Sequence, residues 1–245
     1  MGARIGVGVT TYIRLKHLEL CVKQIKKHTS DYTIYVANDS KERKGIAFRK
    51  NQCLKVLKDC DYIFLFDDDC FPIKEGWAEF FIEAHKASGQ HHFMFLKETP
   101  TIKRIGTHIG QIESNQVLDT MKIKISANVI EIYEYNNCAG CFLFLTKEVI
   151  EKVGGYGQYP MPYGFEHAGF SQRIFNAGLT PLGAYTCPAG IEEYIYSMDY
   201  MFDKPFNKLV NHSPSISNEF HKLESYLKQN QEAYIKDIQI IYQPL

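Results

Sequence analysis

Asp61-Tyr-Ile-Phe-Leu-Phe-Asp67-Asp68-Asp69-Cys-Phe-Pro72 is the stretch that decides the fold of this chain. Its five apolar residues, 62–66, are too few for a typical helix and predict a buried strand. Three aspartates follow the strand at once, and Pro72 disfavours its continuation. Open α/β sheets bind their ligands at the carboxyl ends of the strands. We therefore expect Asp67–Asp69, called the acidic turn below, to lie at a ligand site.

The charge of the acidic turn indicates a cation. Three adjacent carboxylates repel one another, and a divalent cation or another positive partner would relieve that repulsion. Oxygen ligands suit Mg²⁺ or Mn²⁺ better than a soft metal, and such ions usually bridge to the phosphates of a ligand. An acidic surface turn without a ligand is the alternative that the turn alone leaves open.

Composition sets the broad class of the protein. The 245 residues are 45% hydrophobic and 13% aromatic, as in a globular protein of one large domain or two small ones. Lys+Arg and Asp+Glu balance at 28 each, so there is no strong nucleic-acid signature and no global field for anionic membranes. The sequence shows no signal peptide and no membrane span, so we expect a soluble, cytoplasmic protein. The lone C-x-x-C, Cys138–Cys141, lacks the second pair that a zinc site needs.

The segments up to the acidic turn alternate between strand and helix patterns. Strands are predicted at 5–9, 33–37 and 62–66, helices at 15–28 and 45–57, and a loop at 10–12. This alternation predicts an α/β fold with a doubly wound, mostly parallel sheet and right-handed crossovers. The loops that follow the three strands should then lie side by side at one edge of the sheet.

The later segments are less regular. Helices are predicted at 77–87, at 147–153 and from 164 to about 177, and strands at 92–96, 128–135 and 142–145. Residues 97–127 carry no clear pattern, and residues 156–163, rich in Gly, Pro and Tyr, indicate a flap or loop. The part after residue 185 is interpreted as mostly tail, with one helix at about 218–237.

Several motifs, in this order, resemble those of family 2 glycosyltransferases of the GT-A fold. Asn137-Cys-Ala-Gly140, with the apolar residues after it, is similar to that family's glycine-containing acceptor-side strand. Val153-Gly-Gly-Tyr156 is similar to its GGF turn, and the segment opened by Gly164-Phe-Glu166-His167 to its GWEDxDLsxRlxxxG motif. Asn211-His212-Ser-Pro-Ser215 resembles its late H-x-x-S element. Upstream, the alternating strands and helices that end in the acidic turn resemble its nucleotide-binding half.

The resemblance covers about residues 4–215 and implies a role for each matched residue. The residues implied in nucleotide-sugar binding are Thr10, Tyr12, Asp39, Arg49, Asp67 and Asp68. Among these, Tyr12 and Asp39 would hold the nucleobase, and Arg49 would face the ribose or the phosphates. The implied ligands of the metal, Mn²⁺ or Mg²⁺, are Asp69, Asp67 and His212. For Asp39 a capping turn is the alternative, for Tyr12 a packed aromatic, and for His212 an ordinary histidine.

The sequence departs from the family pattern at the catalytic base. The family usually offers Glu-Asp, whose aspartate deprotonates the acceptor hydroxyl, whereas here His167 stands at that aspartate's position. A neutral imidazole with a pKa of about 6.5 can act as a general base at pH 7. Glu166 is the other candidate, and could instead fix the tautomer of His167. Alignment points to His167, while the carboxylate chemistry of the family narrowly favours Glu166. A helix charge and a packed ring are the structural alternative.

These patterns together predict a single GT-A glycosyltransferase domain over residues 1–245. Its expected parts are a nucleotide-sugar-binding half (1–96), an acceptor-side half (97–185) and a C-terminal extension (186–245). The expected activity is a metal-dependent, inverting transfer from a nucleotide-diphosphate sugar, UDP-sugar favoured, to a hydroxyl on a glycan, a protein or a modified nucleic-acid base. The alternatives are a sugar-phosphate nucleotidyltransferase, whose Gly-rich phosphate loop is lacking after the first strand, and a non-catalytic nucleotide-sugar- or carbohydrate-binding module.

Overall fold

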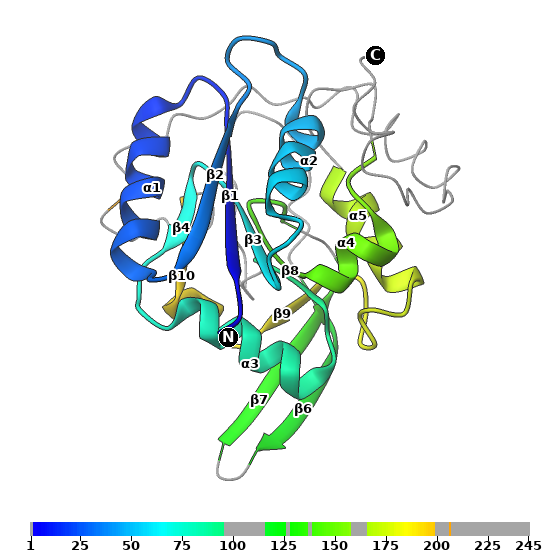
Figure 1. The fold of residues 1–245 in the computed structure, drawn as a ribbon. Coiled ribbons are helices and arrows are strands. Elements are labelled where there is room, and N and C mark those ends of the chain that lie inside the picture. Colours follow the sequence, from blue (N-terminus) through cyan, green and yellow to red (C-terminus); the bar gives the residue numbers. More distant parts are fainter. Residues whose placement is uncertain are drawn as a thin grey trace.

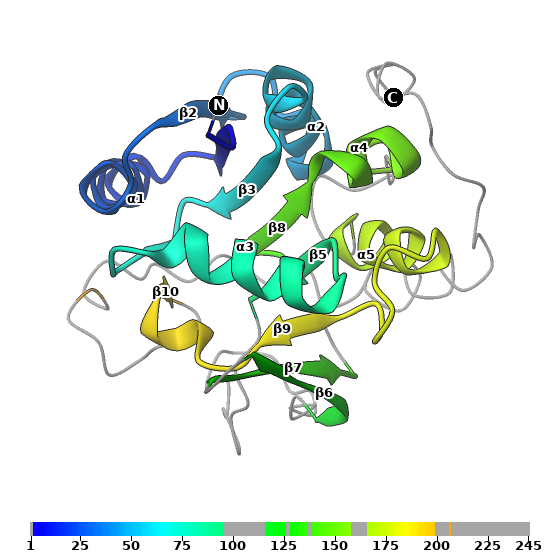
Figure 2. The ribbon, with the colours of Figure 1, turned by 60° about the horizontal axis from the view of Figure 1, so that its bottom comes forward.

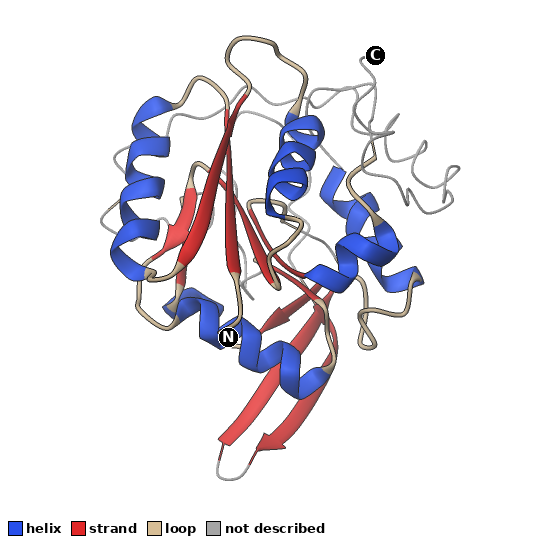
Figure 3. Cartoon of the chain, in the orientation of Figure 1, coloured by secondary structure: helices blue, strands red, loops and turns tan. Residues whose placement is uncertain are grey.

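A central five-stranded sheet with helices on both faces forms the body of the protein (Figures 1 and 3). The computed structural model describes residues 2–95, 116–125, 128–136, 139–157, 166–198 and 206. None of the helices in these ranges is long and apolar enough to cross a bilayer. The predicted helix at about 218–237 lies outside the described residues, as do residues 158–163 of the predicted flap over 156–163.

The central sheet is mostly parallel, as the sequence predicts. Its strands, in spatial order, are β2 (Tyr32–Asn38), β1 (Ile5–Thr11), β3 (Tyr62–Asp67), β8 (Phe142–Thr146) and β5 (His92–Met94). β1 pairs in parallel with both β2 and β3, whereas β8 runs antiparallel between β3 and β5. The expectation of a doubly wound sheet is therefore confirmed, with one reversed strand, β8.

The alternating side chains of β3 serve two hydrophobic cores, one on each face of the sheet. Phe64 and Phe66 face the first core, where the ring of Phe64 lies 4.6 Å from that of Trp77. Ile63 and Leu65 face the second core. Because β3 is buried on both faces, its sequence is a continuous apolar run rather than an alternation of apolar and polar residues.

Helices cover both faces of the sheet, as Figure 2 shows. The helices are α1 (Leu15–His28) and α3 (Trp77–Ser88) on the first core, and α2 (Ile46–Leu57), α4 (Lys147–Val153) and α5 (Glu166–Asn176) on the second. Basic residues 26–28 occupy the last turn of α1, where positive charge interacts favourably with the negative end of the helix dipole. The predicted bounds of α1 and α4 agree with the structure.

Two small sheets correct the sequence interpretation. Their strands are β6 (Val117–Ile125), β7 (Asn128–Tyr135) and β9 (Thr186–Pro188) in one, and β4 (Cys70–Pro72) with β10 (Ile195–Ser197) in the other. The expectation of no clear element over 97–127 was wrong for β6. Residues 186–198 are not tail, because β9, the short 3₁₀ helix η1 (Ile191–Glu193) and β10 pack onto the body.

No strand continues past Pro72, as expected, but a second short strand lies between the acidic turn and this proline. A new strand, β4, begins at Cys70, directly after the acidic turn, and contains Pro72 as its last residue. Proline is tolerated there because it ends a short strand, where no ladder hydrogen bond from its nitrogen is required. The predicted loop at residues 10–12 is likewise shorter, since β1 continues through Thr11.

Gly8 tests the tight packing of β1 against its neighbours. A Cβ at Gly8 would lie 2.7 Å from Cys53 Cβ on α2 and 2.7 Å from Leu65 Cδ2 on β3. We expect Gly8→Ala to lower the free energy of unfolding by about 1–3 kcal/mol, the usual cost of overpacking a core. Urea denaturation measures this loss, with Gly2→Ala as a control because nothing lies within 4 Å of a Cβ there. Equal stability of the two variants would contradict the described packing.

Candidate active site

The carboxyl ends of β1, β2 and β3 meet at one edge of the sheet, as predicted, and the acidic turn lies there. Thr10 Oγ1 donates to Asp67 Oδ1 at 2.8 Å, and Thr11 Oγ1 donates to Asp68 Oδ2 at 2.6 Å. Residues 10 and 67 are register partners in the β1–β3 ladder. The pairing of two strands therefore fixes the direction of two carboxylates.

Arg14 supplies positive charge to the acidic turn. Its Nη1 donates to Asp69 Oδ2 at 2.7 Å, and its Nη2 forms an ion pair with Asp68 Oδ1. Burial disfavours the charged guanidinium, but attraction to Asp69 and Asp68 outweighs it and raises the pKa of Arg14. Burial raises the pKa of Asp68 to about 7, against the effect of Arg14. The positive partner that the acidic turn requires is thus a side chain of the β1–α1 loop.

Lys50 of α2 is a second cation at this site, and its side chain is 0% exposed. Its Nζ donates to Gly140 O at 2.7 Å and lies 3.4 Å from Asp67 Oδ1 and 3.5 Å from Glu166 Oε1. Burial alone would favour the neutral amine, yet Asp67 and Glu166 together raise the pKa of Lys50 above its ordinary value. One buried ammonium group therefore joins the acidic turn to the start of α5.

The sequence interpretation missed Lys50 and Arg14. Lys50, Cys53, Leu54 and Leu57 have the i, i+3, i+4, i+7 spacing of a buried helix face, and all four are buried. A lysine on such a face was the signal for an internal counter-ion. Arg14 carried no comparable signal, because its partners are more than fifty residues away in the chain.

Glu166 and His167 form a hydrogen-bonded pair at the beginning of α5. His167 Nδ1 lies 3.1 Å from Glu166 Oε1, and a Cβ at Gly140 would lie 2.3 Å from the same nitrogen. The imidazole therefore packs directly on Gly140, at a position that only glycine can occupy. Although burial opposes it, the contacts with His167 and Lys50 hold the pKa of Glu166 well below its ordinary value. An ionised carboxylate only accepts hydrogen bonds, so Nδ1 of His167 is the donor in this pair.

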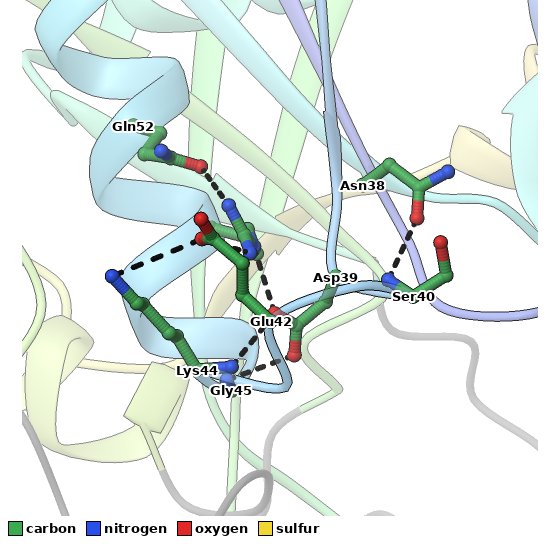
Figure 4. A network of polar contacts seen from close by, with 8 residues as sticks. Asn38, Asp39, Ser40, Glu42, Lys44, Gly45 and Gln52 are labelled. Atoms are coloured by element: carbon green, nitrogen blue, oxygen red, sulfur yellow. Dashed lines mark hydrogen bonds and ion pairs between the residues drawn. The ribbon is translucent and has the colours of Figure 1, made fainter.

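Asp39 and Arg49 organise the loop between β2 and α2 (Figure 4). The guanidinium of Arg49 donates to Asp39 Oδ1 at 2.8 Å, to Gln52 Oε1 at 2.8 Å and to Glu42 Oε2 at 2.9 Å. The carboxylate of Asp39 also accepts the backbone N–H groups of residues 44–45, at 2.8 and 2.9 Å. Both predicted nucleotide contacts thus have partners within the protein, which shape the loop at the edge of the site.

Tyr12 is the most exposed of the predicted site residues that the structure describes, with 37% of its surface accessible. The guanidinium carbon of Arg43 lies 5.6 Å from the centre of its ring. Arg43 has a φ of 50°, a left-handed conformation that is uncommon for a residue with a side chain. The sequence interpretation did not single out Arg43, because nothing in the loop sequence marks a residue of this conformation.

The carboxylate oxygens of the acidic turn fit a hard divalent cation whose remaining ligands are not protein side chains. The described part of the chain holds no cluster of three or more His, Cys, Asp or Glu side chains arranged to enclose a metal ion. His212, the predicted late ligand, lies outside the described residues. Mg²⁺ and similar ions are commonly held by one or two carboxylates together with phosphate oxygens and waters. Asp69 and Asp67 can supply those carboxylates.

Comparison with known proteins supports the fold. No family model matches the sequence. Over 141 residues the chain is 30% identical to an uncharacterized glycosyltransferase of Acanthamoeba polyphaga mimivirus. The matched region covers 56% of this chain and 48% of that protein. The chain thus spans about half the length of the curated relative it matches.

A solved structure matches almost the whole chain. The Drosophila β-1,4-galactosyltransferase 7, in complex with manganese, UDP-Gal and xylobiose, superposes with a TM-score of 0.51 and 16% identity, over 97% of this chain and 84% of that one. The chain therefore has the GT-A fold that its motifs predict.

Lys50→Met tests the buried charge cluster. Removing the amine leaves the carboxylates of Asp67 and Glu166 buried without their shared cation, so we expect a loss of about 3–5 kcal/mol in the free energy of unfolding at pH 7. Denaturant titration measures the loss, and Lys58→Met, an exposed lysine after the same helix, should change stability by less than about 0.5 kcal/mol.

The pH dependence of this loss has a definite sign. The pKa of Lys50 is raised above 10.5, so its contribution is fully present at neutral pH and is lost only in strong alkali. The pKa of Glu166 is depressed below 4.5, so the contribution of its carboxylate falls as the pH drops through and below that value. The difference between Lys50→Met and the original protein should therefore shrink in acid. A difference that grows below pH 4.5 would contradict the proposed pairing.

Proposed function

We propose that this chain, which has the GT-A fold, is a glycosyltransferase that moves a sugar from a nucleotide-diphosphate sugar to an acceptor hydroxyl. One observation carries the proposal: the acidic turn and the Glu166–His167 pair meet across the buried amine of Lys50. A metal-binding carboxylate and a general base are the two groups that such a transfer requires, and here they lie within reach of one ammonium group. The similarity to a curated protein named a glycosyltransferase supports the same activity.

The donor would bind over the carboxyl ends of β1–β3. We assign the nucleobase of the donor to the side of the site where Tyr12 and the Asp39 loop lie. The ribose is assigned to Asp67, whose carboxylate Thr10 holds in a fixed direction. Arg49 would act through Asp39, because each of its donor groups already has a protein acceptor. Asp68 would position the acidic turn, since it is buried against Thr11 and Arg14.

Asp69 and Asp67, with His212, would hold Mn²⁺ or Mg²⁺. Such an ion stabilises the negative charge that develops on the leaving diphosphate. A galactosyltransferase of the same fold was solved with manganese and UDP-Gal, which supports a UDP-sugar as the first donor to test.

We assign the general base to His167 and the positioning role to Glu166. Glu166 is tied to Lys50 and has a depressed pKa, so its carboxylate is a weak proton acceptor. It orients the imidazole through Nδ1, and the neutral imidazole would take the proton of the acceptor hydroxyl. The acceptor oxygen then attacks the anomeric carbon while the bond to the diphosphate breaks, which inverts the configuration. The sequence narrowly favoured Glu166 as the general base, and we propose His167 in its place.

Turnover with candidate donors is the direct test of the activity. The protein is incubated with UDP-sugars and Mn²⁺, and the released UDP is measured over time. Slow release in the absence of acceptor, stimulated by acceptor hydroxyls on a glycan, a protein or a modified base, would support a transferase. Binding of UDP-sugar without any release would indicate a binding module instead.

Asp69→Ala tests the metal ligand. We expect it to abolish the Mn²⁺-dependent part of UDP binding, because the remaining described carboxylates are held by Thr10, Thr11 and Lys50. Titration calorimetry with UDP, with and without Mn²⁺, measures this. Asp59→Ala, an exposed aspartate before β3, is the matched control and should bind as the original protein does. Unchanged metal-dependent affinity in Asp69→Ala would rule out the assignment.

His167→Ala tests the base. We expect a loss of about 10²–10⁴-fold in turnover, the usual contribution of a general base, with nearly unchanged affinity for the metal and the donor. Glu166→Gln should lose less, and the acid limb of its pH–rate profile should move to lower pH because the imidazolium loses an adjacent carboxylate. If His167→Ala keeps a near-normal rate on the true acceptor, the base lies elsewhere.

A further inference from the structure

Arg14 occupies the carboxylates that a metal ion would need. Its two terminal nitrogens reach Asp68 and Asp69 separately, so the guanidinium spans the acidic turn. Its side chain is 29% exposed, whereas that of Lys50 is fully buried behind Asp67. Of these two cations, Arg14 is therefore the one on the accessible side, where a nucleotide would approach.

We propose that Arg14 is an exchangeable counter-ion, which a divalent cation displaces from Asp69 and which then binds the diphosphate of the donor. This inference rests on the proposed function, because it assumes that Asp69 is a metal ligand. Arg14 keeps the acidic turn neutralised and in place before the metal and the nucleotide arrive.

Competition follows from the charges at the site. A divalent cation next to Asp69 and a guanidinium hydrogen-bonded to the same carboxylate repel each other, and both require its oxygens. The metal alone must therefore break the contact between Arg14 and Asp69 without offering the guanidinium a new partner. Metal binding to the free protein should be weak for this reason.

A diphosphate changes this balance. Its oxygens offer the released guanidinium the bidentate acceptor geometry that arginine prefers. The β1–α1 loop, which carries Arg14, also carries Tyr12, two residues earlier. Exchange of Arg14 would thus couple arrival of the metal to arrival of the nucleotide, and each would raise the affinity for the other.

The experiment compares Mn²⁺ affinity with and without UDP in Arg14→Gln. Binding is followed by the electron paramagnetic resonance signal of free Mn²⁺ and by calorimetry, so no turnover is needed. We expect Arg14→Gln to bind Mn²⁺ alone about tenfold more tightly than the original protein, a typical size for coupling between two sites. The factor by which UDP increases Mn²⁺ affinity should fall by a similar amount.

Two control variants separate the exchange from a general effect of charge. Lys16→Gln removes an exposed positive charge on the first turn of α1 and should change neither quantity. Arg14→Lys keeps the charge without the planar fork and should lie between the original protein and Arg14→Gln. Circular dichroism of each variant confirms that the fold is kept.

The outcomes separate this inference from the proposed function. If the original protein binds Mn²⁺ with UDP but Arg14→Gln gains no affinity for Mn²⁺ alone, the exchange is wrong and the metal site stands. Equal gains in Arg14→Gln and Lys16→Gln would also overturn it, because the effect would then be one of net charge. If neither the original protein nor Arg14→Gln binds Mn²⁺, with or without UDP, the proposed metal-dependent function fails together with the exchange.

Discussion

Three carboxylates gathered at the end of one buried strand need cations, and this requirement governs the arrangement of the site. Arg14 comes from the loop before α1 and Lys50 from the buried face of α2, so the acidic turn is held from both sides of the sheet. Lys50 also reaches Glu166 on α5. The same charge balance that makes burial of the acidic turn possible therefore joins the end of β3 to the start of α5.

Much of the fold follows from local patterns. The apolar run 62–66, the helical spacing of residues 15–28 and the alternation of strands and helices predict β3, α1 and the doubly wound sheet, because each depends on side chains close together in the chain. The acidic turn was found in the same way, whereas the Glu166–His167 pair was found through its resemblance to a family motif. Residues 186–197 were not found, since the short strands β9 and β10 depend on pairing with distant segments. Residues 117–125 were not found either, because β6 is half-exposed and polar, although it pairs with the neighbouring strand β7.

The roles of single side chains were harder to predict than their location. Asp39 and Arg49 were correctly expected at the sheet edge, yet their contacts with each other and with the loop backbone could not be read from the sequence. The choice between Glu166 and His167 depends on Lys50, which lies more than a hundred residues earlier. The division of residues 1–245 into two halves and an extension stays a prediction.

The reversed strand β8 has a consequence for synthesis of the protein. β8 fills the sheet between β3 and β5, but about 75 residues separate the end of β3 from its start. At about 5–20 residues per second, the ribosome needs about 4–15 s to supply them. During that interval one edge of the apolar strand β3 has no partner, and unpaired edges of this kind are templates for aggregation. Shielding of β3 until residue 146 has emerged would therefore lower the risk of aggregation during synthesis.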